Sequence, residues 1–353
     1  MILNGKTVLI TGGTGSLGKT LVRRILHGDC GRPRKIIVFS RDEAKQHEMR
    51  MAYKNKAVAT DEIIYHNFEE LVDFRIGDVR DFHSIASALG EADIVFNAAA
   101  LKQVPTCEYF PYEAVQTNIA GPENIVRAIQ ELRLPVETVV GISTDKACKP
   151  VNVMGMTKAI QERVFIQGNL RCPRTRFICV RYGNVLASRG SVIPLFHEQI
   201  RVGGPVTITV PEMTRFLLSL NDAVDLIIDA VRSANPGETY IPRVPAARVI
   251  DIAEVLIGDR DIEIRIIGIR PGEKVHEVLV SEEECHRTVQ RGNRYVIKSI
   301  LPELQGKTPE RECLKKEYSS SDDVMTKDAL AALLRRQKLL LDSEETAERE
   351  LLR

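Results

Sequence analysis

The stretch 6-KTVLITGGTGSLGKT-20 decides the fold of this chain. An apolar strand over residues 6–11 leads into three glycines spaced three apart, and an amphipathic helix over 16–27 follows. Glycines at this spacing let the backbone turn tightly and approach a pyrophosphate, which rests at the positive end of the helix. The stretch therefore predicts a dinucleotide site, with the contacts supplied by Gly12, Thr14, Gly15, Ser16, Leu17 and Gly18.

The first half of the chain repeats this alternation of apolar strands and helices. The expected strands are 6–11, 35–40, 72–77, 93–98, 138–144 and 176–183, and a second clear helix covers 113–132. Near-continuous apolar strands that alternate with helices are typical of a parallel sheet covered on both faces. Right-handed crossovers then make a doubly wound α/β sheet of the Rossmann type the expected fold.

The pattern loosens after about residue 184, where prolines separate shorter elements. We expect a dinucleotide-binding domain over 1–184 and a mainly substrate-binding domain over 185–353, with some later segments rejoining the first sheet. The segment 54–71 is long for a connection between two strands and predicts an extra surface element. The segment 327–341 predicts a charged amphipathic helix, packed on the surface in preference to a subunit contact.

The composition is that of an ordinary globular protein, with 44% hydrophobic and 27% charged residues and a net charge of +1. This balance favours neither nucleic acid nor a membrane surface as a partner. Apolar runs fall short of the roughly 18 residues that span a bilayer. The seven cysteines and seven histidines are dispersed, so we expect reduced thiols, a cytoplasmic location and no metal site.

The end of the second strand, 39-FSRDEAK-45, indicates which dinucleotide is bound. Ser40 and Arg41 stand where NAD enzymes carry an acidic residue for the ribose, and they suit a 2′-phosphate instead. Asp42 comes one or two positions late, so NADP is expected over NAD. Further cofactor contacts are expected where the third and fourth strands end, at Asp78, Val79, Ala98 and Ala99.

The stretch 150-PVNVMGMTKA-159 is similar to the catalytic helix of short-chain dehydrogenases, which carries Tyr-x-x-x-Lys. Here Met154 fills the tyrosine slot, and a thioether neither gives nor accepts a proton. Lys158 lies one helical turn later, on the same face. Just upstream, 143-STDKACKP-150 places Thr144, Asp145 and Lys146 at the carboxyl end of a parallel strand, where ligands of doubly wound folds bind. An acid beside a potential base suits proton removal and loss of water.

Several long blocks together resemble the inverting UDP-N-acetylglucosamine 4,6-dehydratases, which belong to the polysaccharide biosynthesis proteins among the extended short-chain dehydrogenases. The similarity covers about residues 5 to 280 and includes a capsular subgroup that also carries Met in the tyrosine slot. The blocks are 100-ALKQVPTCEYFPYEAVQTNIAG-121, 143-STDKACKPVNVMGMTKA-159, 181-RYGNVLASRGSVIPLF-196, 214-TRF-216 and 269-IRPGEKVHE-277.

The resemblance implies oxidation of the sugar at C4 by NADP, loss of water across C5 and C6, and return of the hydride to C6. It implies that Asp145 protonates the leaving C6 hydroxyl, that Lys146 is the base at C5, and that Thr144 hydrogen-bonds the sugar. Lys158 would hold the nicotinamide ribose. The C4 proton would pass to Asp145 or to a water ordered by Lys158.

The same blocks imply contacts to a nucleotide sugar, with UDP-N-acetylglucosamine as the expected substrate. Arginines at such a site form forked contacts to phosphate, and an acidic side chain binds ribose hydroxyls. The implied substrate contacts are Lys102, Asn184, Arg189, Ser191, Val192, Arg215, Arg270 and Glu273. Relatives form dimers or hexamers, so a homo-oligomer is expected. Two alternatives stay open: a nucleotide-sugar 4-epimerase or 4-ketoreductase, and an inactive NADP-binding scaffold.

Overall fold

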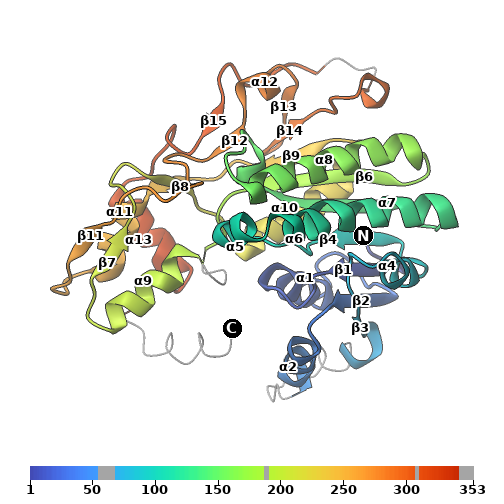
Figure 1. Cartoon of the computed structure of the whole chain (residues 1–353), viewed down its shortest axis with the longest axis horizontal. Coiled ribbons are helices and arrows are strands. Elements are labelled where there is room, and N and C mark those ends of the chain that lie inside the picture. Colours follow the sequence, from blue (N-terminus) through green and yellow to red (C-terminus); the bar gives the residue numbers. More distant parts are fainter. Residues whose placement is uncertain (55–67, 187–190, 307–309, 342–353) are drawn as a thin grey trace.

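The computed structural model describes residues 1–54, 68–186, 191–306 and 310–341, and these residues form a nine-stranded central sheet (Figure 1). Its order is β13–β14–β9–β6–β5–β4–β1–β2–β3. The six strands expected from the sequence are confirmed to within one residue at each end: β1 (Thr7–Thr11), β2 (Lys35–Ser40), β3 (Val72–Ile76), β4 (Ile94–Asn97), β5 (Thr138–Thr144) and β6 (Arg176–Tyr182).

The strand order reverses beside β1, which pairs in parallel with β2 on one side and with β4 on the other. The chain leaves these neighbouring strands in opposite directions, and the crevice between them is where doubly wound folds bind ligands. Later segments extend the sheet beyond β6. Strand β9 (Thr239–Pro242) is parallel to β6, and the hairpin β13 (Thr288–Arg291) with β14 (Arg294–Ile297) completes the edge in antiparallel pairing.

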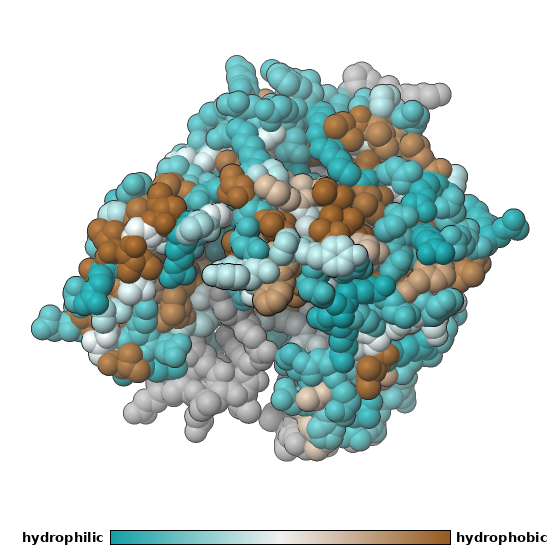
Figure 2. Space-filling model, in the orientation of Figure 1, coloured by the Kyte–Doolittle hydropathy of each residue, from teal (hydrophilic) through white to brown (hydrophobic). Residues whose placement is uncertain are grey.

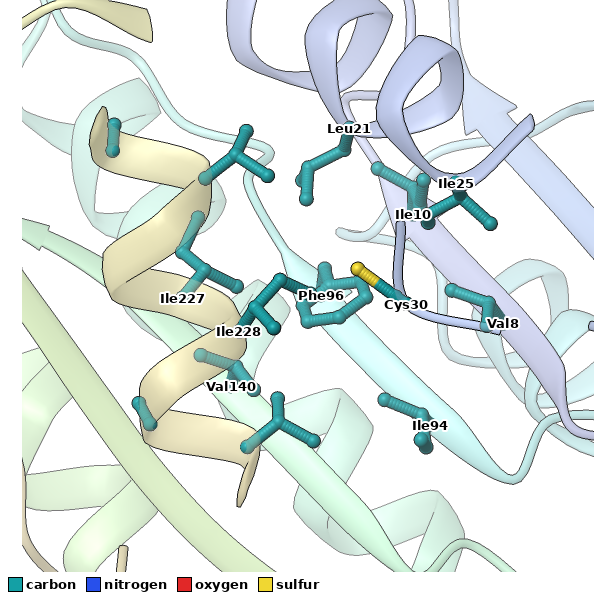
Figure 3. Close-up of a cluster of buried hydrophobic side chains, with 14 of the residues drawn as sticks. Val8, Ile10, Leu21, Ile25, Cys30, Ile94, Phe96, Val140, Ile227 and Ile228 are labelled. Atoms are coloured by element: carbon teal, nitrogen blue, oxygen red, sulfur yellow. The ribbon is translucent and has the colours of Figure 1, made fainter. Parts of the chain in front are cut away.

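Helices cover both faces of the sheet, which explains why its strands are apolar on both sides. On one face α1 (Ser16–Leu26) lies against α10 (Leu220–Ser233). Figure 3 shows Leu21 and Ile25 of α1 converging with Ile227 and Ile228 of α10 on Phe96 of the sheet. The other face carries α4 (Phe82–Leu89), α7 (Gly121–Leu132) and α8 (Val153–Arg171), packed in that order.

A smaller lobe has an apolar core of its own and lies on the left in Figure 1. It contains α9 (Val192–Arg201), α11 (Val249–Ile257), α13 (Lys327–Arg336) and the parallel pair β7 (Val206–Ile208) and β11 (Ile264–Ile266). Leu330 and Leu334 of α13 are fully buried, with α13 against α11, as expected for a packed helix. The helix ends at Arg336 instead of residue 341, and Lys338 then adopts a left-handed φ of 55°.

Further elements complete the described chain. They are α2 (Glu43–Lys54), α5 (Val104–Tyr109), α6 (Pro111–Val115), η1 (Gln116–Ala120), η2 (Asp145–Ala147), β8 (Thr214–Phe216) paired with β10 (Ala246–Arg248), β12 (Val278–Val280) paired with β15 (Tyr318–Ser319), α12 (Glu282–Cys285) and η3 (Pro302–Leu304). The helix expected over 113–132 is interrupted by η1, a π-helical turn. Most of the surface element expected over 54–71 falls on residues 55–67, outside the described residues.

The surface mixes polar and apolar side chains. In Figure 2 apolar patches lie over the smaller lobe and over the region of α8, where Met156 and Ile160 are exposed, amid a largely hydrophilic face. Within the described parts of the chain, every helix is too short or too polar to cross a membrane.

Candidate active site

The loop from β1 to α1 has the form that a dinucleotide pyrophosphate requires. Gly12 has a φ of 64°, and a Cβ placed on it would lie 2.9 Å from the Ala99 backbone. A Cβ on Gly18 would lie 2.4 Å from the carbonyl oxygen of Gly13. Only glycine fits both positions, so the backbone comes close to strand β4 and the amino end of α1 faces the loop. The residues present therefore fit a dinucleotide cofactor.

A cavity of about 820 Å³ lies over the carboxyl ends of the parallel strands and reaches the smaller lobe. All of the expected cofactor and catalytic residues line it: Gly12, Thr14, Gly15, Ser16, Leu17, Gly18, Ser40, Arg41, Asp78, Val79, Ala98, Ala99, Thr144, Asp145, Lys146, Met154 and Lys158. Six expected substrate residues line it too, namely Lys102, Asn184, Ser191, Arg215, Arg270 and Glu273. Val192 is not in the wall, because it begins α9 and packs on the core of the smaller lobe, and Arg189 lies outside the described residues.

At the end of β2, where the adenosine ribose is expected, polar and charged side chains line the cavity. Ser40 is buried, and its hydroxyl accepts a hydrogen bond from the Gln46 amide at 3.1 Å. The Arg41 guanidinium is half exposed and lies 3.8 Å from the Asp78 carboxylate. Lys45 also lines this end of the cavity and forms an ion pair with Asp42. Because the Arg41 guanidinium is only loosely paired with Asp78, it can bind a phosphate group without losing a strong ion pair.

The expected acid and base lie at the end of β5, where the chain enters η2. The Asp145 side chain is 1% exposed, and one of its oxygens accepts hydrogen bonds from the Thr144 hydroxyl at 2.9 Å and from Lys146 Nζ at 3.1 Å. Its other oxygen, Oδ2, is buried without a hydrogen-bond partner among the described residues. Burial raises the pKa of Asp145, and the Glu277 carboxylate raises it further. Asp145 is thus disposed to hold a proton.

Lys146 lies between two carboxylates. Its Nζ is 3.1 Å from Asp145 and 3.0 Å from Oε1 of Glu277, a buried residue of the segment before β12. Burial by itself would lower the pKa of Lys146, but the two carboxylates more than offset burial and raise that pKa above its usual value. For Glu277, burial is outweighed by Lys146 and Arg215, so the pKa of this carboxyl is lowered.

The helix α8 presents Met154 and Lys158 to the same cavity. Met154 is buried against Cys107 and Ala114, in the space where a phenol would otherwise stand. Lys158 is also buried, and its Nζ donates to Oε1 of Gln161 at 2.6 Å. Burial lowers the pKa of Lys158 to about 8. Tyr182 lines the cavity as well, but burial raises the pKa of its phenol, so it is a poor proton acceptor in place of the missing tyrosine.

Arg215 and Glu273 make protein contacts besides facing the cavity. Arg215 is buried, and its guanidinium donates to the carbonyl oxygens of Thr214, Lys274 and Val275, which ties β8 to the segment before β12. The Glu273 carboxylate accepts from the Thr209 hydroxyl at 3.3 Å. Arg270, in contrast, is exposed at the cavity mouth. Of the two arginines expected to bind phosphate, Arg270 is therefore the more accessible to a ligand.

Among the residues not expected from the sequence, two contact the expected lysines directly. Glu277 is the last residue of the block 269-IRPGEKVHE-277, and its place in that block is the sequence feature that could have indicated a role in the site. Gln161 follows Lys158 by three residues on α8, and its own amide nitrogen donates to the Ile142 carbonyl oxygen at 3.0 Å. That contact fixes the amide oxygen toward Lys158, which only the folded structure reveals.

The π-helical turn η1 also braces the site. Asn118 of this turn accepts from the Leu101 backbone N–H at 2.8 Å and donates to the Leu101 carbonyl and to the Thr157 hydroxyl. It therefore joins the loop after β4 to α8, beside Lys158. Such π-turns are frequent at functional sites. The hydroxyl of Thr117, one residue earlier, lines the cavity and has no hydrogen-bond partner among the described residues.

The protein has an extended short-chain dehydrogenase/reductase fold. The features that show this are the reversal of strand order, the glycine loop and the cavity above them. Residues 8–299 match the family model described as polysaccharide biosynthesis protein. The match covers most of the chain, so the protein belongs to the polysaccharide biosynthesis protein family. Within the described residues, no cluster of three or more His, Cys, Asp or Glu side chains could hold a metal ion.

Individual relatives agree with this placement. A protein of Rickettsia bellii (strain OSU 85-389) named UDP-glucose 4-epimerase is 46% identical over 298 residues, which are 83% of this chain and 82% of that protein. The X-ray structure of Pen from Bacillus thuringiensis is 34% identical, with a TM-score of 0.85 and coverage of 96% of this chain and 100% of that chain. The dTDP-glucose 4,6-dehydratase DesIV from Streptomyces venezuelae, solved with NAD, is 19% identical over 76% of this chain and 86% of its own. Its TM-score of 0.64 shows a shared fold.

Proposed function

We propose that the protein is an NADP-dependent 4,6-dehydratase that acts on UDP-N-acetylglucosamine and inverts C5, for the synthesis of a surface polysaccharide. One observation carries the proposal. A buried carboxyl with a raised pKa, Asp145, lies against Lys146 in the same cavity as Lys158, while Met154 fills the tyrosine slot. A site with its own acid and base beside the cofactor loop suits elimination of water.

The residues have distinct roles in this proposal. When bound, NADP accepts the C4 hydride and later returns it to C6. Asp145 protonates the departing C6 hydroxyl, and Lys146 takes the proton from C5. Thr144, which is hydrogen-bonded to Asp145, orients the sugar hydroxyls. Lys158 holds the nicotinamide ribose from the buried face of α8. A water that Lys158 orders takes the proton of the C4 hydroxyl as the hydride leaves, because Asp145 already carries a proton in this proposal.

A 4-epimerase is the second candidate, because relatives at 46% identity carry the name UDP-glucose 4-epimerase. Epimerisation at C4 needs a group that takes and returns the proton of the C4 hydroxyl, and tyrosine ordinarily does this in the fold. Met154 cannot. Epimerisation also has no use for an acid placed to expel the C6 hydroxyl, so the Asp145–Lys146 pair favours the dehydratase.

Incubation of the purified protein with UDP-N-acetylglucosamine and NADP separates the candidates. A 4-keto-6-deoxy product, detected by NMR without net consumption of NADP, is the expected result. Formation of UDP-N-acetylgalactosamine with no loss of water would establish the epimerase instead. Binding of NADP with no turnover would indicate an inactive NADP-binding scaffold and would overturn the proposal.

The choice of NADP rests on Ser40, Arg41 and Lys45 at the end of β2. A charge-assisted hydrogen bond contributes about 1.5–3 kcal/mol, so Arg41→Ala should weaken NADP binding by about tenfold or more and leave NAD binding nearly unchanged. Titration of each dinucleotide by calorimetry tests this. Arg32→Ala is the matched control, because Arg32 is an exposed arginine with an ion pair to Glu70 and does not line the cavity. Equal losses for NAD and NADP would refute the preference.

A further inference from the structure

Glu277 is the least expected member of the catalytic cavity. It comes from the segment that enters β12, 131 positions after Lys146, and its side chain is 2% exposed. The backbone N–H of Glu277 donates to the Ser320 hydroxyl, and the Ser320 N–H donates to the Glu277 carbonyl oxygen. These bonds to the β15 region hold the residue firmly while its carboxylate reaches the end of β5.

The contacts of the carboxylate are unequal. Oε1 accepts from Lys146 Nζ at 3.0 Å and lies 3.9 Å from Nε of Arg215. Oε2 is buried and has no hydrogen-bond partner among the described residues, as is also true of Oδ2 of Asp145. A buried carboxylate oxygen left unpaired is costly, so such atoms in a ligand cavity point to a proton or a ligand that completes them.

The charges around Lys146 come from three elements. Asp145 precedes it on η2, Arg215 is on β8, and Lys274 and Glu277 are in the segment before β12. If Asp145 and Glu277 were both ionised, two carboxylates would compete for one ammonium in a dry site. Arg215 and Lys274 lower the pKa of Glu277, whereas burial and the Glu277 carboxylate raise the pKa of Asp145, so Asp145 is the first of the two to take up a proton.

We propose that Glu277 is a positioning residue of the dehydration step, which sets the protonation of the Asp145–Lys146 pair. The inference rests on the proposed 4,6-dehydratase activity and adds a third member to its acid and base. In the resting site Asp145 is protonated, Lys146 is an ammonium and Glu277 is a carboxylate. Lys146 becomes a base only when its ammonium gives up a proton, and Glu277 is the acceptor along the 3.0 Å contact. Because the pKa of Lys146 is raised and that of Glu277 is lowered, this transfer is uphill, and the neutral amine forms only transiently, during the dehydration step.

The dehydration step then balances. The C5–H bond breaks and its proton goes to the Lys146 amine, while its electron pair forms the C5–C6 double bond. The C6–O bond breaks, and the oxygen leaves as water with the proton of Asp145. No further oxidant or reductant is needed for this step, because C4 has already been oxidised in the proposed reaction.

Glu277→Gln tests the proposal, because glutamine keeps the size of the side chain and an oxygen that can accept from Lys146. We expect NADPH formation on addition of substrate to stay within about threefold of wild type, and formation of the 4-keto-6-deoxy product to fall about 100-fold. The negative charge of Glu277 raises the pKa of Asp145, so its removal should move the alkaline limb of the dehydration profile to lower pH. A purely structural carboxylate would be replaced by glutamine with neither effect.

Two further variants complete the test. Glu282→Gln removes a charge from the exposed start of α12 and should leave the profile unchanged. Glu277→Asp keeps the charge but shortens the side chain, so it should slow dehydration and leave the alkaline limb of the pH profile near its wild-type position. This variant also tests the proposal if Glu277→Gln fails to fold. A Glu277 variant that folds and dehydrates with the wild-type rate and profile, or that loses both half-reactions equally, would overturn the inference. Absence of dehydrated product from the wild type would instead refute the proposed function.

Discussion

Two lysines line one cavity, and their surroundings are opposite. Lys158 is buried, whereas the Lys146 side chain is 22% exposed. Lys146, on η2, touches the carboxylates of Asp145 and Glu277. Lys158, on α8, donates to the neutral amide of Gln161, while the Glu162 carboxylate of the same helix is bound to Arg181 and Ser143. The pKa of Lys146 is raised above the usual lysine value, and the pKa of Lys158 is lowered to about 8.

The difference shows that burial alone does not decide the charge of a lysine. Burial lowers the pKa of both side chains, and only the partner changes the outcome. The site therefore contains one firmly charged lysine, which we place at the proposed dehydration step, and one easily discharged lysine, which we place at the proposed oxidation step. Substitutions at the two positions should accordingly have different and partly opposite effects.

The largest expected effect is on dehydration. Lys146→Met should lower formation of the 4-keto-6-deoxy product by about 10³-fold, within the range that loss of a general base costs. NADPH formation should persist, because C4 oxidation is assigned to the side of Lys158. Single-turnover mixing with substrate, followed by NADPH absorbance and product NMR, separates the two steps. If Lys146→Met lowered NADPH formation to the same degree, Lys146 would also be needed for C4 oxidation, and the separate roles of the two lysines would be wrong.

The next effect is on stability and has opposite signs at the two sites. The pKa of Lys158 falls from 10.5 to about 8, so the folded protein at pH 7 bears a penalty of about 3 kcal/mol for holding its ammonium. Lys158→Met should recover much of this penalty. Lys146→Met should destabilise the fold, because it leaves the buried Glu277 carboxylate without the ammonium it contacts and removes a hydrogen bond to Asp145. Urea unfolding of both variants near pH 7 provides the comparison.

The same linkage predicts a pH dependence. The unfolded chain binds more protons at Lys158 than the folded chain does between about pH 8 and 10.5, so wild-type stability from this group rises through that window. The advantage of Lys158→Met should therefore shrink as the pH rises from about 8 to 10.5. Destabilisation by both methionine variants at neutral pH would contradict the contrast between the lysines.

The smallest effect is expected from a substitution that gives Lys158 a carboxylate partner, as Lys146 already has. Gln161→Glu places a carboxylate where Lys158 now meets an amide, and the pKa of Lys158 should rise. C4 oxidation is expected to decline as the pH rises through about 8 in the wild type, because the ammonium is lost, and the variant should move this decline upward by about one unit. The initial rate of NADPH formation against pH measures it. A wild-type rate that increases through pH 8 would identify the neutral amine as the proton acceptor.

Local patterns in the sequence predict the sheet and the cofactor loop well. Residues 6–18 form one strand, one turn and the start of α1, so the spacing of their glycines is enough to predict the geometry. The partners of the two lysines are harder to predict. Glu277 meets Lys146 through the packing of distant segments, and Gln161 acts only because the Ile142 carbonyl fixes its amide. Arg215 is expected as a phosphate ligand, yet in the structure it also joins β8 to residues 274 and 275.

The helix expected over 113–132 shows the same limit. Its apolar periodicity is sound at both ends, but the π-helical turn at Gln116–Ala120 shifts the register between them. Asn118 makes its bonds to Leu101 and Thr157 from this turn. A hydrophobic pattern records which face is buried and contains no information on a single extra residue in a turn.

The late arrival of β9 in the central sheet has a consequence for synthesis on the ribosome. A nascent chain that has emerged as far as Tyr182 already contains the glycine loop and both lysines, but the outer edge of β6 has no neighbour until Thr239–Pro242 pairs with it. An uncovered strand edge invites pairing with other chains. The half-made protein is thus exposed to aggregation while α10 and β9 are still to be added. A dinucleotide that binds to the part already folded would stabilise it during this interval.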